Sequence, residues 1–416
     1  MITPKFYFIL LTHGLIASIC SEELTYRGEN SVSKAIKCPD NEGSTINIGD
    51  PDMYITTTEL LQRFGYKAEE HTVKTDDGYI LTMHRIPGAP GATPVFLQHC
   101  LGCSSFVWIV NGKNKSIALL LADKGYDVWF GNARGNTYSR CHEKLSTSDS
   151  QFWNFSWHEM GIYDLPAEIT YVTKETHKDI LYIGYSMGTT MFYVMAIERP
   201  DIASKVKAMF SLSPVVYMSS IESPFGVLSQ YANISESVSK LTGGGGEVLS
   251  QNIFTKLSLS FVCNTISFLQ NICIQAMFSF FGFSPEQFDY ETLPLILSHL
   301  PAGTSQKTVT HYNQLVESGR FSHYDYGPEG NLKIYNSKEA PDYDLSKIQV
   351  PIAIFWSDND YLTFAKDIQR FYDQIPKKIL NYKVQDKNFN HIDFLWAKDV
   401  NTLLYSTLLS TMEKYK

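Results

Sequence analysis

The chain has 416 residues, a formal net charge of -8 and 44% hydrophobic residues. This composition is typical of a globular protein and excludes a disordered chain, and the length suits one decorated α/β domain or two domains. The acidic balance, with no run of lysine and arginine, argues against a nucleic-acid partner because binding phosphate needs basic patches.

The N-terminal residues predict a secretory signal peptide over residues 1–20. Lys5 precedes an apolar run from Phe6 to Cys20, and acidic residues follow directly. A signal anchor is the alternative interpretation. No later segment has about 18 uninterrupted apolar residues, so we expect no transmembrane segment in the mature chain. Three Asn-x-Ser sequons favour the secretory pathway and are glycosylation candidates: Asn114, Asn154 and Asn233.

The next elements are an arm, a helix and a hairpin. Residues 21–50 are polar and aperiodic, which predicts an extended arm. A helix is expected over residues 52–64, with Asp52 or Thr57 as its cap. Residues 71–75 and 79–85 flank Asp76-Asp77-Gly78, which predicts a β-hairpin with a D-G turn.

Strands and helices then alternate along the chain. Strands are expected at residues 94–98, 126–130, 180–183 and 206–212. Helices are expected at residues 116–124, at 156–176 as one long amphipathic helix, and from the residue after Ser186 to a point before Pro200. This alternation predicts βαβ units, a mainly parallel sheet and an α/β fold class.

Between residues 214 and 326 the strand rhythm stops and the apolar pattern becomes helical. Strand patterns return at residues 350–356 and 379–384. An insertion this long exceeds an ordinary loop. We therefore expect a core over 51–213, a cap or lid over 214–326 at the carboxyl ends of the strands, and the rest of the core over 327–416.

A nucleophile elbow is predicted at Gly184-Tyr185-Ser186-Met187-Gly188, where a buried strand runs into a helix. Ser186 is the candidate nucleophile. Gly184 and Gly188 stand where a Cβ would collide with the strand or the helix. Because chance G-x-S-x-G matches are common, the motif depends on its context.

A serine hydroxyl needs a histidine as its base and an acid that orients the histidine. In the fold that carries a nucleophile elbow, the acid and then the histidine follow the serine along the chain. Asp358 and Asp360 both follow the strand at 350–356, and spacing alone does not decide between them. His391 lies after the last strand and is the candidate base. We interpret Asp393 as a helix cap rather than a second acid partner.

The backbone N–H groups of Met187 and Leu101 are the candidate oxyanion donors, since one follows the nucleophile and the other follows an early strand. Cys100 and Cys103 form an isolated C-x-x-C near several histidines, without the spacing of a metal site, so no metal and no cofactor is expected. The aromatic run at residues 278–283 favours core packing, with an acyl-binding wall as the alternative.

The chain resembles the acid lipase family of α/β-hydrolases, which contains lysosomal acid lipase and gastric lipases. The resemblance runs from about residue 50 to the C-terminus. It rests on the segments at residues 75–81, 95–99, 126–140, 163–167, 301–305 and 391–394. It implies a Ser186, Asp360 and His391 triad, oxyanion donation by Leu101 and Met187, a mobile lid and a Cys263–Cys273 disulfide.

The chain departs from the family pattern at three positions. Cys100 stands where the family has glycine, so a positive φ there would strain the chain and misplace the Leu101 N–H. Tyr185 replaces a histidine and could reshape the wall that faces the lid. Met187 replaces a glutamine and keeps its backbone donor.

The sequence therefore predicts a lysosomal or extracellular ester hydrolase that cleaves neutral lipid esters such as triacylglycerols or sterol esters. It would contact a lipid droplet or membrane surface transiently. Two alternatives stay open at this point. One is a thioesterase or peptidase on the same fold, and the other is a catalytically impaired lipid carrier, which Cys100 favours.

Overall fold

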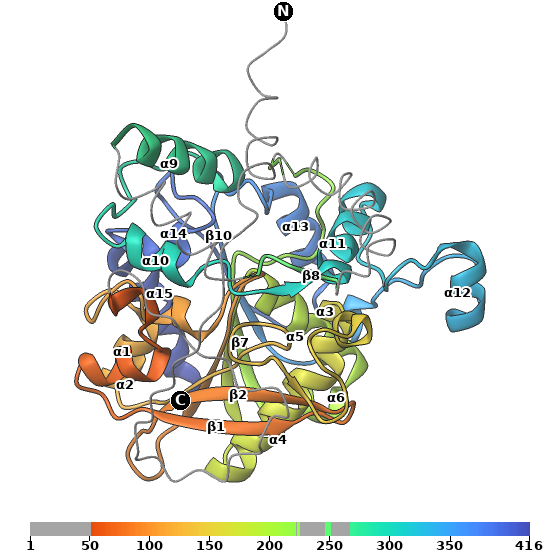
Figure 1. Ribbon diagram of the computed structural model, residues 1–416, viewed down its shortest axis with the longest axis horizontal. Helices are drawn as coiled ribbons and strands as arrows, with labels where there is room; N and C mark the ends of the chain where they lie inside the picture. Colours follow the sequence, from red (N-terminus) through yellow and green to blue (C-terminus); the bar gives the residue numbers. More distant parts are fainter. Residues whose placement is uncertain (1–50, 222, 225–245, 251–266) are drawn as a thin grey trace, which may run out of the picture.

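The computed structural model describes residues 51–221, 223–224, 246–250 and 267–416 (Figure 1). The predicted signal peptide, the predicted arm, Asn233 and Cys263 lie outside the described residues. Within the described part of the chain, no helix is both long and apolar enough to cross a membrane.

A mostly parallel sheet forms the centre of the molecule. Its order is β1-β2-β4-β3-β6-β7-β10-β11, with β5 paired to β2. The pairs from β4 to β11 are parallel, and those made by β2 are antiparallel. The strands are β1 (Glu69–Lys74), β2 (Tyr79–Ile86), β3 (Pro94–Gln98), β4 (Asp127–Phe130), β5 (Cys141–His142), β6 (Ile180–Tyr185), β7 (Val206–Leu212), β10 (Ile352–Trp356) and β11 (Lys378–Lys383).

The apolar runs in the sequence explain the central strands. Every residue of β3, β4 and β6 is buried, as expected for strands covered on both faces. β3, β6, β7, β10 and β11 are consecutive, parallel neighbours, so the loops that follow them meet along one edge of the sheet. The predicted α/β fold class is confirmed.

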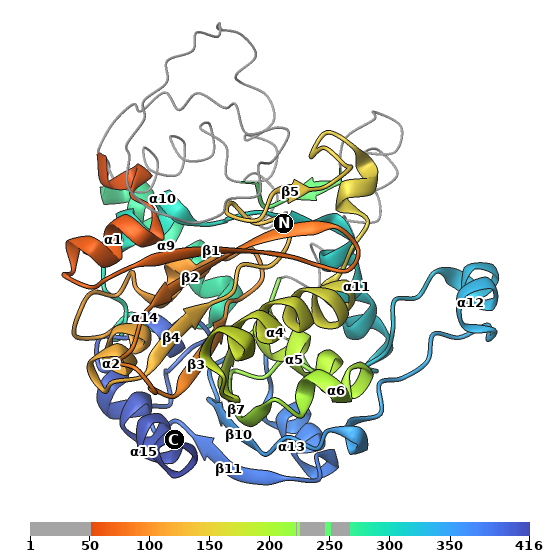
Figure 2. The same cartoon turned by 90° about the horizontal axis from the view of Figure 1, so that it is seen from below.

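Helices cover both faces of this sheet, and Figure 2 shows α2 and α15 on one face and α4, α5, α6 and α13 on the other. The helices are α1 (Thr57–Arg63), α2 (Ile117–Asp123), α3 (Trp157–Glu159), α4 (Leu165–Thr176), α5 (Met187–Glu198), α6 (Pro200–Ala203), α9 (Ser267–Phe281), α10 (Leu293–His299), α11 (Gln306–Ser318), α12 (Gly327–Tyr335), α13 (Ala365–Gln374), α14 (Asp393–Trp396) and α15 (Ser406–Met412).

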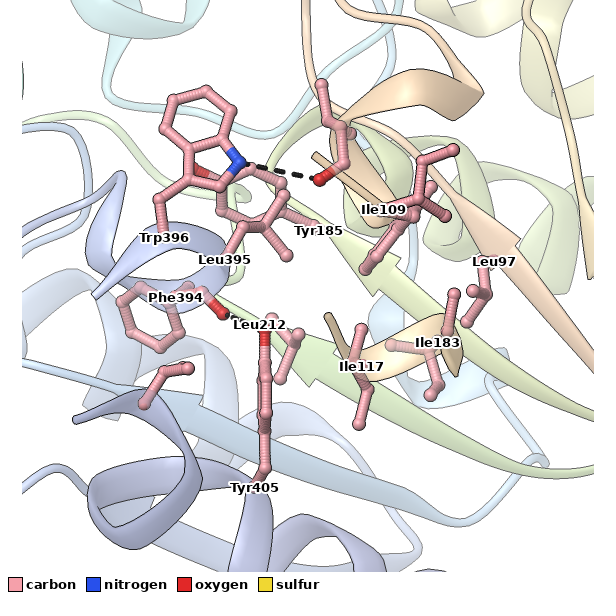
Figure 3. Close-up of a cluster of buried hydrophobic side chains, with 14 of the residues drawn as sticks. Leu97, Ile109, Ile117, Ile183, Tyr185, Leu212, Phe394, Leu395, Trp396 and Tyr405 are labelled. Atoms are coloured by element: carbon pink, nitrogen blue, oxygen red, sulfur yellow. Dashed lines mark hydrogen bonds between the residues drawn. The ribbon is translucent and has the colours of Figure 1, made fainter. Parts of the chain in front are cut away.

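Each face has its own hydrophobic core. Figure 3 shows part of the first core, in which Leu97, Ile183 and Leu212 of three neighbouring strands lie near Ile117 of α2 and Tyr405. The second core joins alternate residues of the same strands to α4, α5 and α13. Since side chains alternate across a strand, one fully apolar strand supplies both cores.

Two helix predictions were wrong in detail. The predicted helix over 156–176 is interrupted by a π-helical turn at Met160–Asp164, between α3 and α4. Pro166 follows at the start of α4 and has no N–H for a helical hydrogen bond, which accounts for the irregular turn. The cap of α1 is Thr56 rather than Asp52 or Thr57, because Thr56 and Glu59 form a capping box.

The chain between β7 and β10 contributes α9, α10, α11 and α12, and a small sheet of β8 (Glu247–Val248) and β9 (Thr304–Ser305). In Figure 1, α9, α10 and α11 lie across the upper end of the molecule. α12, which the sequence did not predict, projects away from the body in both views.

Candidate active site

Ser186 lies on a tight turn between β6 and α5, as predicted. Its φ of 53° and ψ of -117° are rare for a residue with a side chain. A Cβ on Gly184 would lie 2.8 Å from the Gly188 carbonyl oxygen, and one on Gly188 would lie 2.2 Å from the Gln98 carbonyl oxygen. Both positions therefore need glycine for steric reasons.

The structure brings Ser186, His391 and Asp360 together from three loops that follow parallel strands. His391 Nε2 accepts from Ser186 Oγ at 3.0 Å, and His391 Nδ1 donates to Asp360 Oδ2 at 2.8 Å. All three residues are buried. Burial raises the pKa of Asp360, but the His391 imidazole and hydrogen bonds from Ser213 and Leu362 outweigh it, so the pKa lies below its usual value.

Asp358 and Asp393, the other carboxylates considered, lie elsewhere. Asp358 is on the surface in an ion pair with Lys383. Asp393 is the first residue of α14, and its Oδ2 accepts from the Asn390 N–H at 2.8 Å rather than from His391. Burial raises the pKa of Asp393 to about 7.

Ser213 is a member of this cluster that the sequence did not predict. Its Oγ donates to Asp360 Oδ2 at 2.6 Å and lies 2.9 Å from His391 Nδ1. Ser213 directly follows β7 and has a positive φ of 49°. The only signal in the sequence was its place after a buried strand, next to the strand that precedes Ser186.

The chain around α9 supports the histidine. The His391 N–H donates to the Phe281 carbonyl at 3.1 Å, and the Phe281 ring stacks on the imidazole. Asn390 Nδ2 donates to the Gly282 carbonyl at 2.7 Å. Tyr185 donates its hydroxyl to the His391 carbonyl at 2.7 Å.

These contacts revise two interpretations of aromatic residues. Tyr185 is buried against His391 and within the core of Figure 3, so it supports the imidazole and does not form a wall toward the lid. In the run at residues 278–283, Phe278 packs in the core, Phe281 contacts His391, and Phe283 is exposed. Core packing therefore describes only part of that run.

Leu101 and Met187 are the predicted oxyanion donors. Met187 is the first residue of α5, and the first N–H groups of a helix have no intrahelical acceptor. Leu101 follows β3 and lines a pocket together with Ser186. The remaining residues of that pocket are almost all apolar: Val215, Met218, Tyr312 and Leu362.

The expected strain at Cys100 is not present. Cys100 has a negative φ, and the left-handed residue of the loop is Gly102, with φ 64°. Cys100 and Cys103 are joined in a disulfide, so the C-x-x-C is a cross-link within the loop rather than an isolated pair of thiols.

The remaining predicted positions are partly described. Asn114 and Asn154 are exposed. Cys273 is disulfide-bonded, whereas Cys263 lies outside the described residues. Among the residues that the structure describes, no group of three His, Cys, Asp or Glu side chains is arranged to hold a metal ion.

The chemistry of this cluster follows from its connections. A buried serine hydroxyl bonded to an imidazole, itself bonded to a carboxylate, is the arrangement that turns a weak nucleophile into one able to attack an acyl carbon. The apolar pocket beside the hydroxyl suits a hydrocarbon chain.

Sequence comparisons agree with this geometry. Residues 57–112 match a partial alpha/beta-hydrolase lipase region, and residues 93–398 match the alpha/beta hydrolase fold. The chain is 41% identical to Lipase 1 of Drosophila melanogaster over 87% of this chain and 81% of that protein. It is 35% identical to human gastric triacylglycerol lipase over 88% of this chain and 93% of that protein.

Solved structures agree on the fold. A chain from Sulfolobus solfataricus superposes with a TM-score of 0.54 at 14% identity, covering 84% of this chain and 94% of that one. DcsB in complex with its substrate analogue superposes with a TM-score of 0.52 at 12% identity, covering 84% of this chain and 100% of that one. With a family match over most of its length and relatives above 30% identity, the chain belongs to the lipase family of α/β-hydrolases, as its resemblance to acid lipases predicts.

Proposed function

We propose that Ser186, His391 and Asp360 are the catalytic triad of this lipase. The observation that carries the proposal is the continuous hydrogen-bonded path from Ser186 Oγ through both nitrogens of His391 to Asp360 Oδ2. The lowered pKa of Asp360 keeps the acid ionised, so it can orient the imidazole and stabilise its protonated form.

The reaction proceeds through an acyl-enzyme. Ser186 Oγ attacks the ester carbonyl carbon while His391 Nε2 takes its proton. The backbone N–H groups of Leu101 and Met187 bind the oxyanion. Collapse expels the alcohol, which receives the proton from His391. Water then attacks the acyl-enzyme with His391 as base, and the fatty acid leaves Ser186.

Neutral lipid esters such as triacylglycerols or sterol esters are the proposed substrates. The apolar lining of the pocket beside Ser186 suits an acyl chain, and the relative named gastric triacylglycerol lipase supports the same class. We place residues 214–326 as a cap over the core formed by 51–213 and 327–416. The enzyme would meet its substrate transiently at a lipid droplet or membrane surface, in the lysosome or outside the cell.

The test compares wild type with Ser186→Ala on emulsions of triolein and cholesteryl oleate. Loss of the nucleophile should lower kcat by about 10⁴-fold or more. Asp360→Asn should lower it strongly as well, because the imidazole then lacks its carboxylate. Asp358→Asn is the matched control, since that exposed aspartate bonds Lys383 instead, and it should retain full activity.

Two results would contradict the proposal. One is an Ser186→Ala variant that still releases fatty acid at the wild-type rate. The other is a wild-type enzyme that cleaves peptide amides or acyl thioesters but neither of the lipid esters.

A further inference from the structure

The Cys100–Cys103 disulfide spans the loop that carries one of the proposed oxyanion donors. The two cysteines are three positions apart, and the cross-link encloses only Leu101 and Gly102. We propose that Cys100 and Cys103 are positioning residues that hold the Leu101 N–H toward the oxyanion. This inference rests on the proposed function, because it assumes that Ser186 attacks an acyl carbon.

The four residues form a closed turn. The Cys103 N–H donates to the Cys100 carbonyl at 3.2 Å, φ is negative at Leu101, and Gly102 has φ 64°. This is the pattern of a type II turn, in which the third residue needs a positive φ. The disulfide joins the side chains of the first and fourth residues of this turn. It therefore restricts rotation of the backbone on either side of Leu101.

Hydrogen bonds hold the carbonyl groups of this turn from several directions. His99 Nδ1 donates to the Cys100 carbonyl at 2.8 Å, and Asn136 Nδ2 donates to the Cys103 carbonyl at 3.3 Å. The Gly102 carbonyl accepts from the Ala302 N–H at 2.7 Å. The Leu101 N–H belongs to the same planar peptide group as the Cys100 carbonyl, so the bonds to that carbonyl and the cross-link constrain the same peptide.

The burial of the disulfide favours a permanent constraint over a redox pair. Cys100 is 8% exposed and Cys103 is 5% exposed, and both belong to the first hydrophobic core. Thiol–disulfide exchange requires a thiolate to reach one of the sulfurs, and burial prevents that approach. The bond is therefore expected to persist through the catalytic cycle.

The expected effect lies on kcat rather than on KM. Removing one oxyanion donor typically lowers kcat by about 10²–10³-fold. A loop that has lost its cross-link but kept the bonds from His99 and Asn136 should lose somewhat less, about 10–100-fold. Substrate binding in the pocket does not use the oxyanion, so KM should change by less than about 3-fold.

The experiment compares wild type, the Cys100→Ser/Cys103→Ser double variant and Cys141→Ser, the last removing a different disulfide-bonded cysteine, on β5. Active sites are counted by end-point titration with a fluorophosphonate, and kcat is expressed per titrated site. Inhibition by an alkylboronic acid, which forms a tetrahedral adduct with the nucleophile, reports on the oxyanion donors directly.

We expect the double variant to lose kcat per titrated site and boronate affinity by similar factors, with Cys141→Ser unchanged in both. Peptide mapping of the native enzyme should recover the Cys100–Cys103 bond. Free thiols at both positions, or a double variant whose only loss is in the number of titratable sites, would overturn the inference. Ser186→Ala keeps the two proposals separate, since activity in that variant contradicts the triad whatever the disulfide does.

Discussion

At the scale of single residues, Ser213 shows how a small side chain completes the proposed catalytic cluster. Its hydroxyl shares the Asp360 oxygen that binds His391 and is one of the groups that lower the pKa of Asp360. The other Asp360 oxygen accepts the N–H groups of Leu362 and Thr363. The carboxylate is therefore held by four donors and cannot rotate away from the imidazole.

Ser213→Ala should lower kcat by about 10-fold with little change in KM. The reason is that one hydrogen bond to a buried charge contributes about 1.5–3 kcal/mol. Steady-state kinetics on a soluble short-chain ester would measure this. Ser357→Ala is the matched control, because within the described structure the buried Ser357 hydroxyl has no hydrogen-bond partner. Equal kcat values for the two variants would show that Ser213 does not support the acid.

At the scale of elements, the segment that ends α9 joins the loops that follow β10 and β11. Phe281 and Gly282 accept hydrogen bonds from the histidine loop, and Asn359 of the acid loop donates to the Phe283 carbonyl. The part of the chain inserted between β7 and β10 therefore sets the positions of both the acid and the base. Through these contacts the insertion is structurally coupled to the candidate site.

Gly282→Ala should destabilise the fold by about 2 kcal/mol or more and lower kcat. A Cβ there would lie 2.0 Å from the Asn359 carbonyl oxygen, at a φ of 110° that side chains rarely adopt. Urea unfolding and kcat measure the two effects. Gly91→Ala has a comparable positive φ of 81° with open space around it, so it isolates the backbone cost of about 1 kcal/mol. Similar losses in both variants would exclude the Gly282–Asn359 contact as the cause.

A second link at this scale joins segments that the sequence comparison singled out. Arg134, buried after β4, donates to Asp77 in the β1–β2 turn and to Asp164 before α4. Three of the segments that resemble acid lipases, at residues 75–81, 126–140 and 163–167, are thus joined by one ion-pair network. None of these four hydrogen bonds involves Ser186 or His391.

At the scale of the whole molecule, two sets of buried groups give stability opposite pH dependences. Burial raises the pKa of Asp164 to about 6 and that of Asp393 to about 7. Burial lowers the pKa of His99 and of His158 to about 4. The folded state binds more protons than the unfolded state at the acids and fewer at the histidines.

The free energy of unfolding should therefore change little between about pH 4 and 6, fall between about pH 6.5 and 7 as Asp393 ionises, and level off at higher pH. In the lower range the acids and histidines offset one another. Between about pH 6.5 and 7 the histidines are neutral in both the folded and the unfolded protein, whereas the buried Asp393 carboxyl is still losing its proton as the pH rises. Thermal unfolding scanned from pH 6.5 to 8 would measure the fall, and a rise over that range would contradict it.

Asp393→Asn should remove part of this fall. The amide can still accept from the Asn390 N–H but never ionises, so we expect the variant to be more stable than wild type by about 1–4 kcal/mol at pH 8. The gain should vanish near pH 4, where the wild-type carboxyl is protonated. Asp76→Asn removes an exposed carboxylate from the β1–β2 turn and should leave the pH dependence unchanged.

The sequence by itself determined the features that depend on neighbours along the chain. Continuous apolar runs predicted the central strands because a strand covered on both faces has no polar side. Gly184 and Gly188 predicted the turn at Ser186 because only glycine avoids the two carbonyl contacts. The order of serine, acid and histidine followed from strands whose ends share one edge of the sheet.

Only the tertiary structure decided which distant groups meet. Asp360 reaches His391 while Asp358, two residues earlier, pairs with Lys383, a difference that spacing in the sequence cannot express. Ser213 reaches Asp360 only because β7 pairs with β10. The Cys100–Cys103 cross-link likewise needed the backbone of the turn, since the same C-x-x-C spacing also occurs as free thiols or metal ligands. Contacts of this kind depend on the order of strands in the sheet and on backbone angles, which local patterns do not specify.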